Sequence, residues 1–387
     1  MPDVRSHNEG TIYLRADTLR WTAQVTMRDG SRPAAGCKHT DHKPGEKRAC
    51  QEAKAELAKL IALRDRGAPA SARNVTLGRF LETWLVDVRG HLAPATWRKH
   101  RSVIRVHLIP ALGHRRLSDL SVADVRAFLA GRDDLDPQTR RHHRSTLRRA
   151  LGDGLRDGLI TRNVAALAEP PRMNRKQRTY LDADQAKALI DGTRDDRYHA
   201  LWTLAVTTGM RESEMLALRW SDVDLAGRTV SVSRTLHRTR PGDPDYDRKD
   251  PWAFLPPKTD KSRRTIPLAT VTVDALRAHE RRQLEERMAA GKPGKGLVFT
   301  TPAGQPIHGT NLLPLLYAHL ERLGLPRVTI HDLRHSAATV LLASGVPLPV
   351  IAAILGHSTI RVTADLYAHV VPELSRDAAD RMQGAVG

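Results

Sequence analysis

The first part of the chain alternates between short β-prone runs and polar turns before it becomes helical. Residues 11–15 and 20–26 are rich in β-branched and aromatic residues and are bounded by turn residues, which predicts two strands. Residues 27–50 contain several glycines and prolines and are expected to form a loop. From Cys50 onward apolar residues recur at helical spacing: Ala53, Leu57, Leu60 and Ile61. Residues 1–70 therefore predict a small α+β module.

Residues 75–170 show the pattern of an all-α domain. Thr76 is placed to cap a helix, because apolar positions begin directly after it: Leu77, Phe80, Leu81, Trp84 and Leu85. Pro94 suits the first turn of a second helix, whose apolar stripe comprises Trp97, Ile104 and Leu108. Further helices are expected from Ser121 and over residues 138–155. Prolines at 170 and 171 end the block.

Two rows of arginines run along these predicted helices. One row comprises Arg98, Arg101 and Arg105. The other comprises Arg140, Arg144 and Arg148, and it continues into the apolar Leu151 and Leu155. The first turns of the later helix are therefore expected to face a polyanion and the last turns to pack. The plain alternative is a solvated face, because most charge rows bind no ligand.

Residues 173–387 contain both the apolar spacing of helices and the apolar runs of short strands. A strongly apolar helix is expected over residues 198–207, where Gly209 breaks it, and helices are expected over 273–288 and 331–343. Short strands are expected at 230–232, 253–255 and 265–268, with a polar loop around residue 243. The whole chain is thus predicted to be multidomain and mainly α with small β-sheets, and its last part to be a mixed α/β domain.

The composition of the chain indicates which class of molecule it binds. The chain has 387 residues and a formal net charge of +19, which favours a polyanion such as nucleic acid. Aromatic residues make up only 4%, which argues against a platform that stacks single-stranded bases. The two cysteines do not form a disulfide framework, and no signal peptide or long apolar run is visible. We therefore expect a cytoplasmic protein that has no membrane partner.

Six residues suited to phosphate chemistry follow one another in the last part of the chain. His331 and Arg334 lie three residues apart and would share one helix face, where a cation beside an imidazole suits a phosphate better than a core. The others are Arg211 in the run Thr208–Glu214, Lys258 in Pro257–Thr259, His357 in Leu355–Ser358, and Tyr367. This ordered set resembles the tyrosine recombinase (phage integrase) family.

The resemblance implies a role for each residue. Tyr367 would attack a DNA phosphate to give a 3′-phosphotyrosyl link and a free 5′-hydroxyl, while Arg211, Arg334 and His357 would stabilise charge on the phosphate. His331 would accept or relay a proton and Lys258 would act as general acid. Glu214 would brace Arg211, whereas Arg263 and Arg264 are expected to touch DNA backbone or solvent. Such an enzyme needs no cofactor, no metal and no ATP.

The resemblance also implies an architecture and partners. Residues 1–70 would be an arm-type DNA-binding module, 75–170 a helical core-binding (SAM-like) domain, and 173–387 the catalytic domain with a C-terminal tail. The enzyme would integrate or excise a mobile element as a homotetramer on double-stranded attachment sites. An excision factor or a host DNA-bending protein could join it. Whether the tail, residues 371–387, docks on its own protomer or on a neighbour stays open.

Three alternatives remain open. A type IB topoisomerase-like enzyme would use the same chemistry to relax DNA, and a catalytically inactive regulator would only bind it. The third concerns metal binding by Cys37, His39, His42 and Cys50, since cysteine and histidine can hold zinc. Their spacings are irregular for a zinc finger, so the favoured interpretation is a solvated loop without metal.

Overall fold

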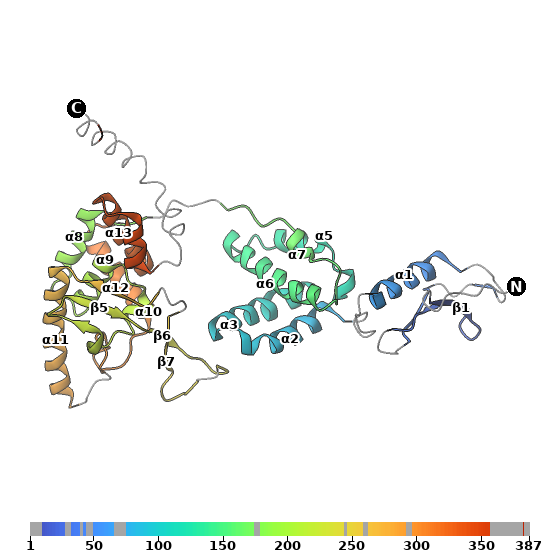
Figure 1. Cartoon of the computed structure of the whole chain (residues 1–387), viewed down its shortest axis with the longest axis horizontal. Helices are drawn as coiled ribbons and strands as arrows, with labels where there is room; N and C mark the ends of the chain where they lie inside the picture. The colour runs from blue at the N-terminus through green and yellow to red at the C-terminus, as the bar shows by residue number, and fades with distance from the viewer. Residues whose placement is uncertain are drawn as a thin grey trace. The chain divides into compact units, whose positions relative to one another are not determined.

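The computed structural model describes residues 10–27, 32–38, 42–43, 49–65, 75–173, 179–243, 246–257, 262–291, 296–356 and 382. The chain divides into two compact units, Met1–Arg175 and Lys176–Gly387 (Figure 1). Helices dominate and the sheets are small, which confirms the expected fold class.

The first unit begins with a three-stranded antiparallel sheet. β1 (Thr11–Arg15) pairs with β2 (Arg20–Gln24), and β2 pairs with β3 (Ala34–Gly36). α1 (Gln51–Asp65) packs on this sheet and buries Ala53 and Leu60. The expectation of a loop over residues 27–50 is wrong at β3. The Ala-Ala-Gly run of β3 carries no strand signal, and main-chain pairing with β2 determines its conformation.

Cys37 directly follows β3 and is only 1% exposed. It packs with the buried Trp21 and Ala53, so the interpretation of a solvated loop is wrong at this residue. His42 and Cys50 are also described, whereas His39 lies outside the described residues.

The rest of the first unit is helical. Thr76 caps the first of these helices, since its side chain accepts a hydrogen bond from the backbone N–H of Arg79. The core is formed by apolar side chains that the periodicity placed inward, among them Leu77, Leu81, Ile104 and Leu108. The helices are α2 (Leu77–Asp87), α3 (Pro94–Val103), the π-helical η3 (Ile104–Leu108), α4 (Ile109–Leu112), α5 (Val122–Ala130), α6 (Pro137–Arg156) and α7 (Val164–Leu167).

The second unit contains two small sheets and seven described α-helices. One antiparallel sheet has the order β4 (Val223–Asp224), β5 (Thr229–Val232), β8 (Arg264–Pro267), and a hairpin joins β6 (Thr235–Arg238) to β7 (Trp252–Leu255). The strands expected near residues 230, 253 and 265 are confirmed, whereas β4 and β6 were not expected. The helices are α8 (Ala183–Gly192), α9 (His199–Thr208), α10 (Glu212–Met215), α11 (Thr270–Ala290), α12 (Leu312–Arg322), α13 (Ile330–Ala343) and α14 (Leu348–Leu355).

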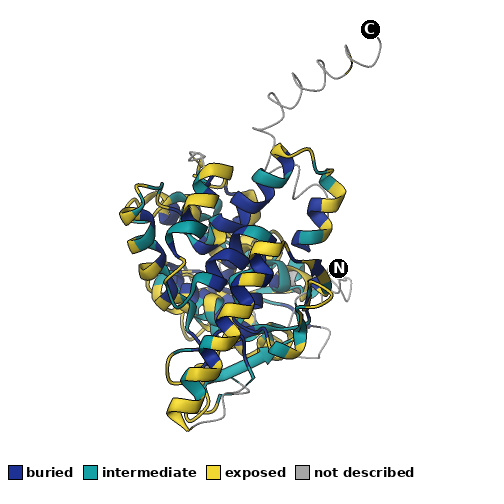
Figure 2. Cartoon of the chain, turned by 90° about the vertical axis from the view of Figure 1, so that its left-hand side faces the viewer, coloured by how far each residue is buried: buried dark blue, intermediate teal, exposed yellow. Residues whose placement is uncertain are grey.

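Helix α9 is the centre of the second unit. It is apolar around its whole circumference, and both α11 and α13 pack on it, which is the environment that such a helix requires. Trp202 is fully buried there. Figure 2 shows the buried faces of the helices turned inward and the exposed faces turned to solvent. Arg334 lies on α13 and Arg211 directly precedes α10, and both of these helices contact α9.

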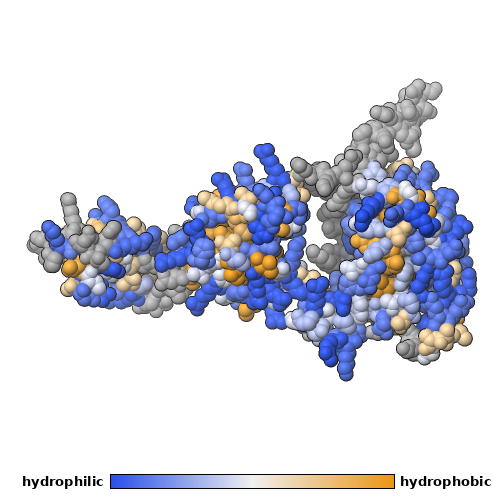
Figure 3. All heavy atoms as spheres, turned by 180° about the vertical axis from the view of Figure 1, so that it is seen from behind, coloured by the Kyte–Doolittle hydropathy of each residue, from blue (hydrophilic) through white to orange (hydrophobic). Residues whose placement is uncertain are grey.

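The surface is mainly polar. On the face seen in Figure 3, hydrophilic residues cover most of both units, with apolar patches between them. Within the part of the chain that the structure describes, none of the helices combines the length and the apolar character needed to cross a bilayer.

Candidate active site

Arg211 lies where the chain breaks between two helices. Helix α9 ends at Gly209, whose φ of +60° is left-handed, and a Cβ atom there would lie 2.5 Å from Cδ2 of Leu355. Glycine is therefore required at the break. Two residues later, Nη1 of Arg211 donates to Oε1 of Glu214 at 2.7 Å, and Nη2 donates to the carbonyl of Gly356 at 3.2 Å. The side chain of Arg211 is 35% exposed, so it remains accessible from solvent.

Glu214 joins two arginines. Its carboxylate is 1% exposed and accepts hydrogen bonds from the backbone and side chain of Arg211 and, at 2.9 Å, from Nη2 of Arg264. Burial raises the pKa of this carboxyl, but the contacts with Arg264 and Arg211 outweigh burial and hold its pKa below the ordinary value. Glu214 is therefore ionised at neutral pH and holds Arg211, as expected.

Arg264 differs from the sequence interpretation, which placed it on DNA backbone or in solvent. Its side chain is 7% exposed. Besides Glu214, it donates from Nε to the carbonyl of Ile354 at 2.5 Å and from Nη1 to the carbonyl of Ser262 at 3.0 Å. Strand alternation could have revealed this, because Arg264 lies two residues before the buried Ile266 and so shares its face of β8.

Arg334 is buried at 3% exposure within α13. Its Nη1 donates to the carbonyl of Gly209 and its Nη2 to the carbonyl of Leu355, both at 2.7 Å. The helix is positioned by a capping box at its start, in which Thr329 and Asp332 exchange side-chain and backbone hydrogen bonds. Arg334 thus connects the end of α9 to the end of α14.

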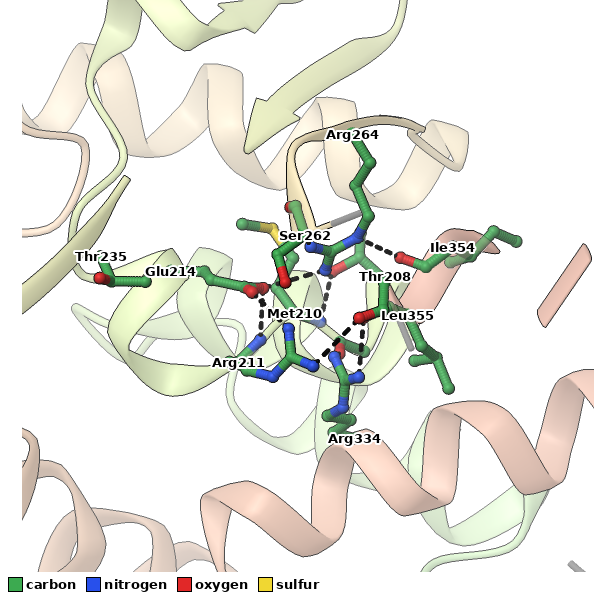
Figure 4. Close-up of polar contacts among 12 residues, drawn as sticks. Thr208, Met210, Arg211, Glu214, Thr235, Ser262, Arg264, Arg334, Ile354 and Leu355 are labelled. Atoms are coloured by element: carbon green, nitrogen blue, oxygen red, sulfur yellow. Dashed lines mark hydrogen bonds and ion pairs between the residues drawn. The ribbon is translucent and has the colours of Figure 1, made fainter. Parts of the chain in front are cut away.

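Three guanidinium groups therefore meet at the C-terminus of α14 (Figure 4). They bind three successive carbonyls, those of Ile354, Leu355 and Gly356. The last carbonyls of a helix have no partner inside it and carry the negative end of its dipole, so cations are favourable there. The contacts fix the backbone up to residue 356, and His357 is the next residue in the chain.

A cavity of about 380 Å³ opens beside Arg211. His331, which is exposed at the start of α13, lines it, and its ring lies edge-on to that of His335 at 4.8 Å. Burial raises the pKa of Glu212, which also lines it. The other basic residues in the wall are His237, Arg238 and His308. Such a wall suits an anion of the size of a phosphodiester.

Three of the six predicted catalytic residues are thus gathered around one region: Arg211, His331 and Arg334. The other three, Lys258, His357 and Tyr367, lie outside the described residues, as does the expected C-terminal tail apart from Met382. Among the described positions, Arg264 is the site residue that the sequence analysis misassigned.

The arginines of the two rows in the helical block differ in their contacts. Arg101 lies 5.0 Å above the ring of Trp97, and Arg105 forms two hydrogen bonds with Glu82. Arg98 is half-buried. Arg101 and Arg105 therefore contact other residues of the same unit. The contact of all three arginines with DNA stays a prediction.

The second row is similar in its first half. Arg140 donates to the carbonyl of Leu129 and to Asp133, and Arg144 donates to the carbonyls of Ala166 and Ala168. Arg148 is exposed. The expectation that the last turns pack holds for Leu151 but is wrong for Leu155, which is 40% exposed because α6 reaches past the core there.

Comparison with known protein families identifies the family of this chain. The phage integrase family model matches residues 179–373, which is half of the chain, and the N-terminal SAM-like domain model of phage integrases matches residues 76–131. The chain belongs to the phage integrase family. The resemblance drawn from the six motif residues is therefore confirmed, and the protein is a tyrosine-type recombinase.

Curated relatives support the assignment. A "Tyrosine recombinase XerC-like" protein of Caldanaerobacter subterraneus is 28% identical over 86% of this chain and 89% of its own length. An integrase of Saccharopolyspora erythraea is also 28% identical, over 99% of this chain and 98% of its own.

Solved structures show the same fold. The Tn1549 transposon integrase, in complex with a circular intermediate DNA, aligns with a TM-score of 0.68 and 21% identity, covering 80% of this chain and 99% of that one. A lambda integrase dimer bound to a core site aligns with a TM-score of 0.56 and 17% identity, with 95% of each chain covered.

Proposed function

We propose that this enzyme is the integrase of a mobile genetic element and that it exchanges DNA strands with Tyr367 as nucleophile. The observation that carries the proposal is the meeting of Arg211 and Arg334 on the carbonyls of Leu355 and Gly356. The two arginines come from elements that are far apart in sequence, and they converge on the two residues that precede His357 in the chain, which is ten residues before Tyr367.

The proposed chemistry divides among the six residues. The oxygen of Tyr367 forms a bond to phosphorus while the bond from phosphorus to the 5′-oxygen breaks. The tyrosine proton passes to His331, and Lys258 gives a proton to the leaving oxygen. Arg211, Arg334 and His357 stabilise the charge that develops on the nonbridging oxygens. A 5′-hydroxyl from the partner duplex reverses these steps and seals the exchanged strand without ATP.

Position supports the proposed roles of the described residues. Arg211 is partly exposed and shares the cavity with His331, so both can reach a bound phosphate. Arg334 is buried and holds the end of α14, which fits a cation whose charge water screens little. We propose that four protomers act together on two double-stranded attachment sites in the cytoplasm, as the resemblance implies.

The test uses a plasmid that carries two copies of the element's attachment site in direct repeat. A recombinase converts the plasmid into two smaller circles with exchanged flanks. Relaxation of supercoils without any exchange would instead establish a topoisomerase-like enzyme. Binding without either product would leave only a DNA-binding protein, and Arg211→Lys serves as the variant expected to bind without exchange.

A further inference from the structure

Two cysteines and a histidine meet at one edge of the N-terminal sheet. The ligand atoms of Cys37, His42 and Cys50 all lie within 4.8 Å of one another, and Sγ of Cys37 is 3.4 Å from Nε2 of His42. Cys37 follows β3 and Cys50 directly precedes α1, while His42 lies in the connection between them. The fold thus brings together three metal-binding side chains that are separated in sequence.

The spacing of these atoms suits zinc. Zinc binds cysteine sulfur at about 2.3 Å and histidine nitrogen at about 2.0 Å, in tetrahedral geometry. Two ligand atoms on such an ion are therefore separated by roughly 3.5 to 3.8 Å. The observed 3.4 Å separation, and the 4.8 Å limit on the others, need only small side-chain shifts to accept the ion.

The surroundings hold the two sulfur atoms in place. Cys37 is 1% exposed and held between Trp21 and Ala53. The sulfur of Cys50 accepts a hydrogen bond from the backbone N–H of Ala53 at 3.4 Å, in the first turn of the 15-residue α1. This contact holds the Cys50 sulfur at the start of α1, within reach of the other two ligand atoms.

A metal ion that links the sheet to the helix would also stabilise this small module. Its buried side chains form two small clusters, one around Leu60 and one around Trp21, and a core of this size rarely holds a fold by itself. We propose that Cys37, His42 and Cys50 bind one zinc ion that ties the end of β3 to the start of α1. Water suffices as the fourth donor. The ion has a structural role and takes no part in strand exchange.

The proposal is tested on the full-length protein, purified with a reducing agent from zinc-supplemented medium and desalted. Elemental analysis should find about one zinc per chain. Cys37→Ser, His42→Ala and Cys50→Ser should each lower this value several-fold, whereas His91→Ala, which removes an exposed histidine of the helical block, should not. Zinc content near zero in the wild type, or unchanged content in all three variants, would overturn the proposal.

A second measurement does not depend on the folding of variants. Wild-type protein is stripped with a chelator and refilled with Co²⁺, whose visible absorption bands report tetrahedral coordination and thiolate ligands. The cobalt spectrum should appear with one equivalent and vanish when zinc is added. Limited trypsin digestion should cut residues 10–65 faster in the stripped protein. A featureless cobalt spectrum combined with unchanged digestion would contradict a zinc site. Strand exchange is measured in a separate assay, so failure of the zinc proposal would leave the proposed integrase function unaffected, and the reverse also holds.

Discussion

The buried pair of Glu214 and Arg264 gives the sharpest quantitative prediction. Replacing Glu214 with glutamine keeps the size of the side chain but removes its charge. The guanidinium of Arg264 would then lie buried at 7% exposure opposite a neutral amide. The amide offers one acceptor in place of two, so at least one N–H group loses its partner.

The magnitude follows from burial. Removing one partner of a buried ion pair costs about 3 to 5 kcal/mol, because the remaining charge is uncompensated. The contact between Glu214 and the 35% exposed Arg211 adds little, since water screens it. We therefore expect Glu214→Gln to destabilise the second unit by about 3 kcal/mol. In the double variant with Arg264→Leu much of this loss should be recovered, because neither charge of this buried pair remains.

Hydrogen exchange measured by mass spectrometry on peptides from α9 is the suitable assay. This helix is buried in the second unit, so its slowest amides report unfolding of that unit alone. Glu285→Gln, an exposed position on α11, is the matched control and should change stability by less than about 0.5 kcal/mol. A loss below about 1 kcal/mol for Glu214→Gln would refute the reasoning.

Three further predictions concern other parts of the chain. Burial lowers the pKa of His143 from 6.5 to about 4, so the unfolded chain takes up the proton first, and His143 by itself should cost the helical block about 3 kcal/mol as pH falls from 6.5 to 4. In urea unfolding, His143→Leu should lose that much less stability than the wild type over this pH range. Gly209→Ala should cost about 2 kcal/mol through its left-handed backbone and the contact with Leu355, measured by the same exchange assay. Arg334→Lys should bind attachment-site DNA normally but cleave it about 100-fold more slowly, because an ammonium cannot fork between two acceptors.

Local signals in the sequence predicted much of the fold. Thr76 marked a helix start, and Gly209 marked a helix end, because capping and left-handed backbone depend on neighbouring residues only. Strand β3 could not be predicted, because its pairing with β2 and not its composition determines it.

The site was predictable in its residue types but not in its contacts. The spacing of His331 and Arg334 indicated phosphate chemistry, and the resemblance to the recombinase family added Arg211. The arginines meet at the carbonyls at the end of α14 because elements distant in sequence pack together there. Such packing cannot be recognised from a single sequence. Arg264 was misassigned for the same reason, since its charge suggested the surface while its partners are internal. The sequence named the cysteine and histidine group, but its irregular spacing favoured a loop without metal, and only the structure shows that three of the ligand atoms lie close together.

Covalent trapping tests the central claim most directly. The protein is incubated with a nicked duplex from the attachment region of its own element and then denatured, beside the Tyr367→Phe variant. The account predicts a DNA-linked protein band in the wild type that is absent from the variant, with equal binding of the duplex by both. A wild type that binds the duplex without forming the band, or a band that persists in Tyr367→Phe, would contradict it.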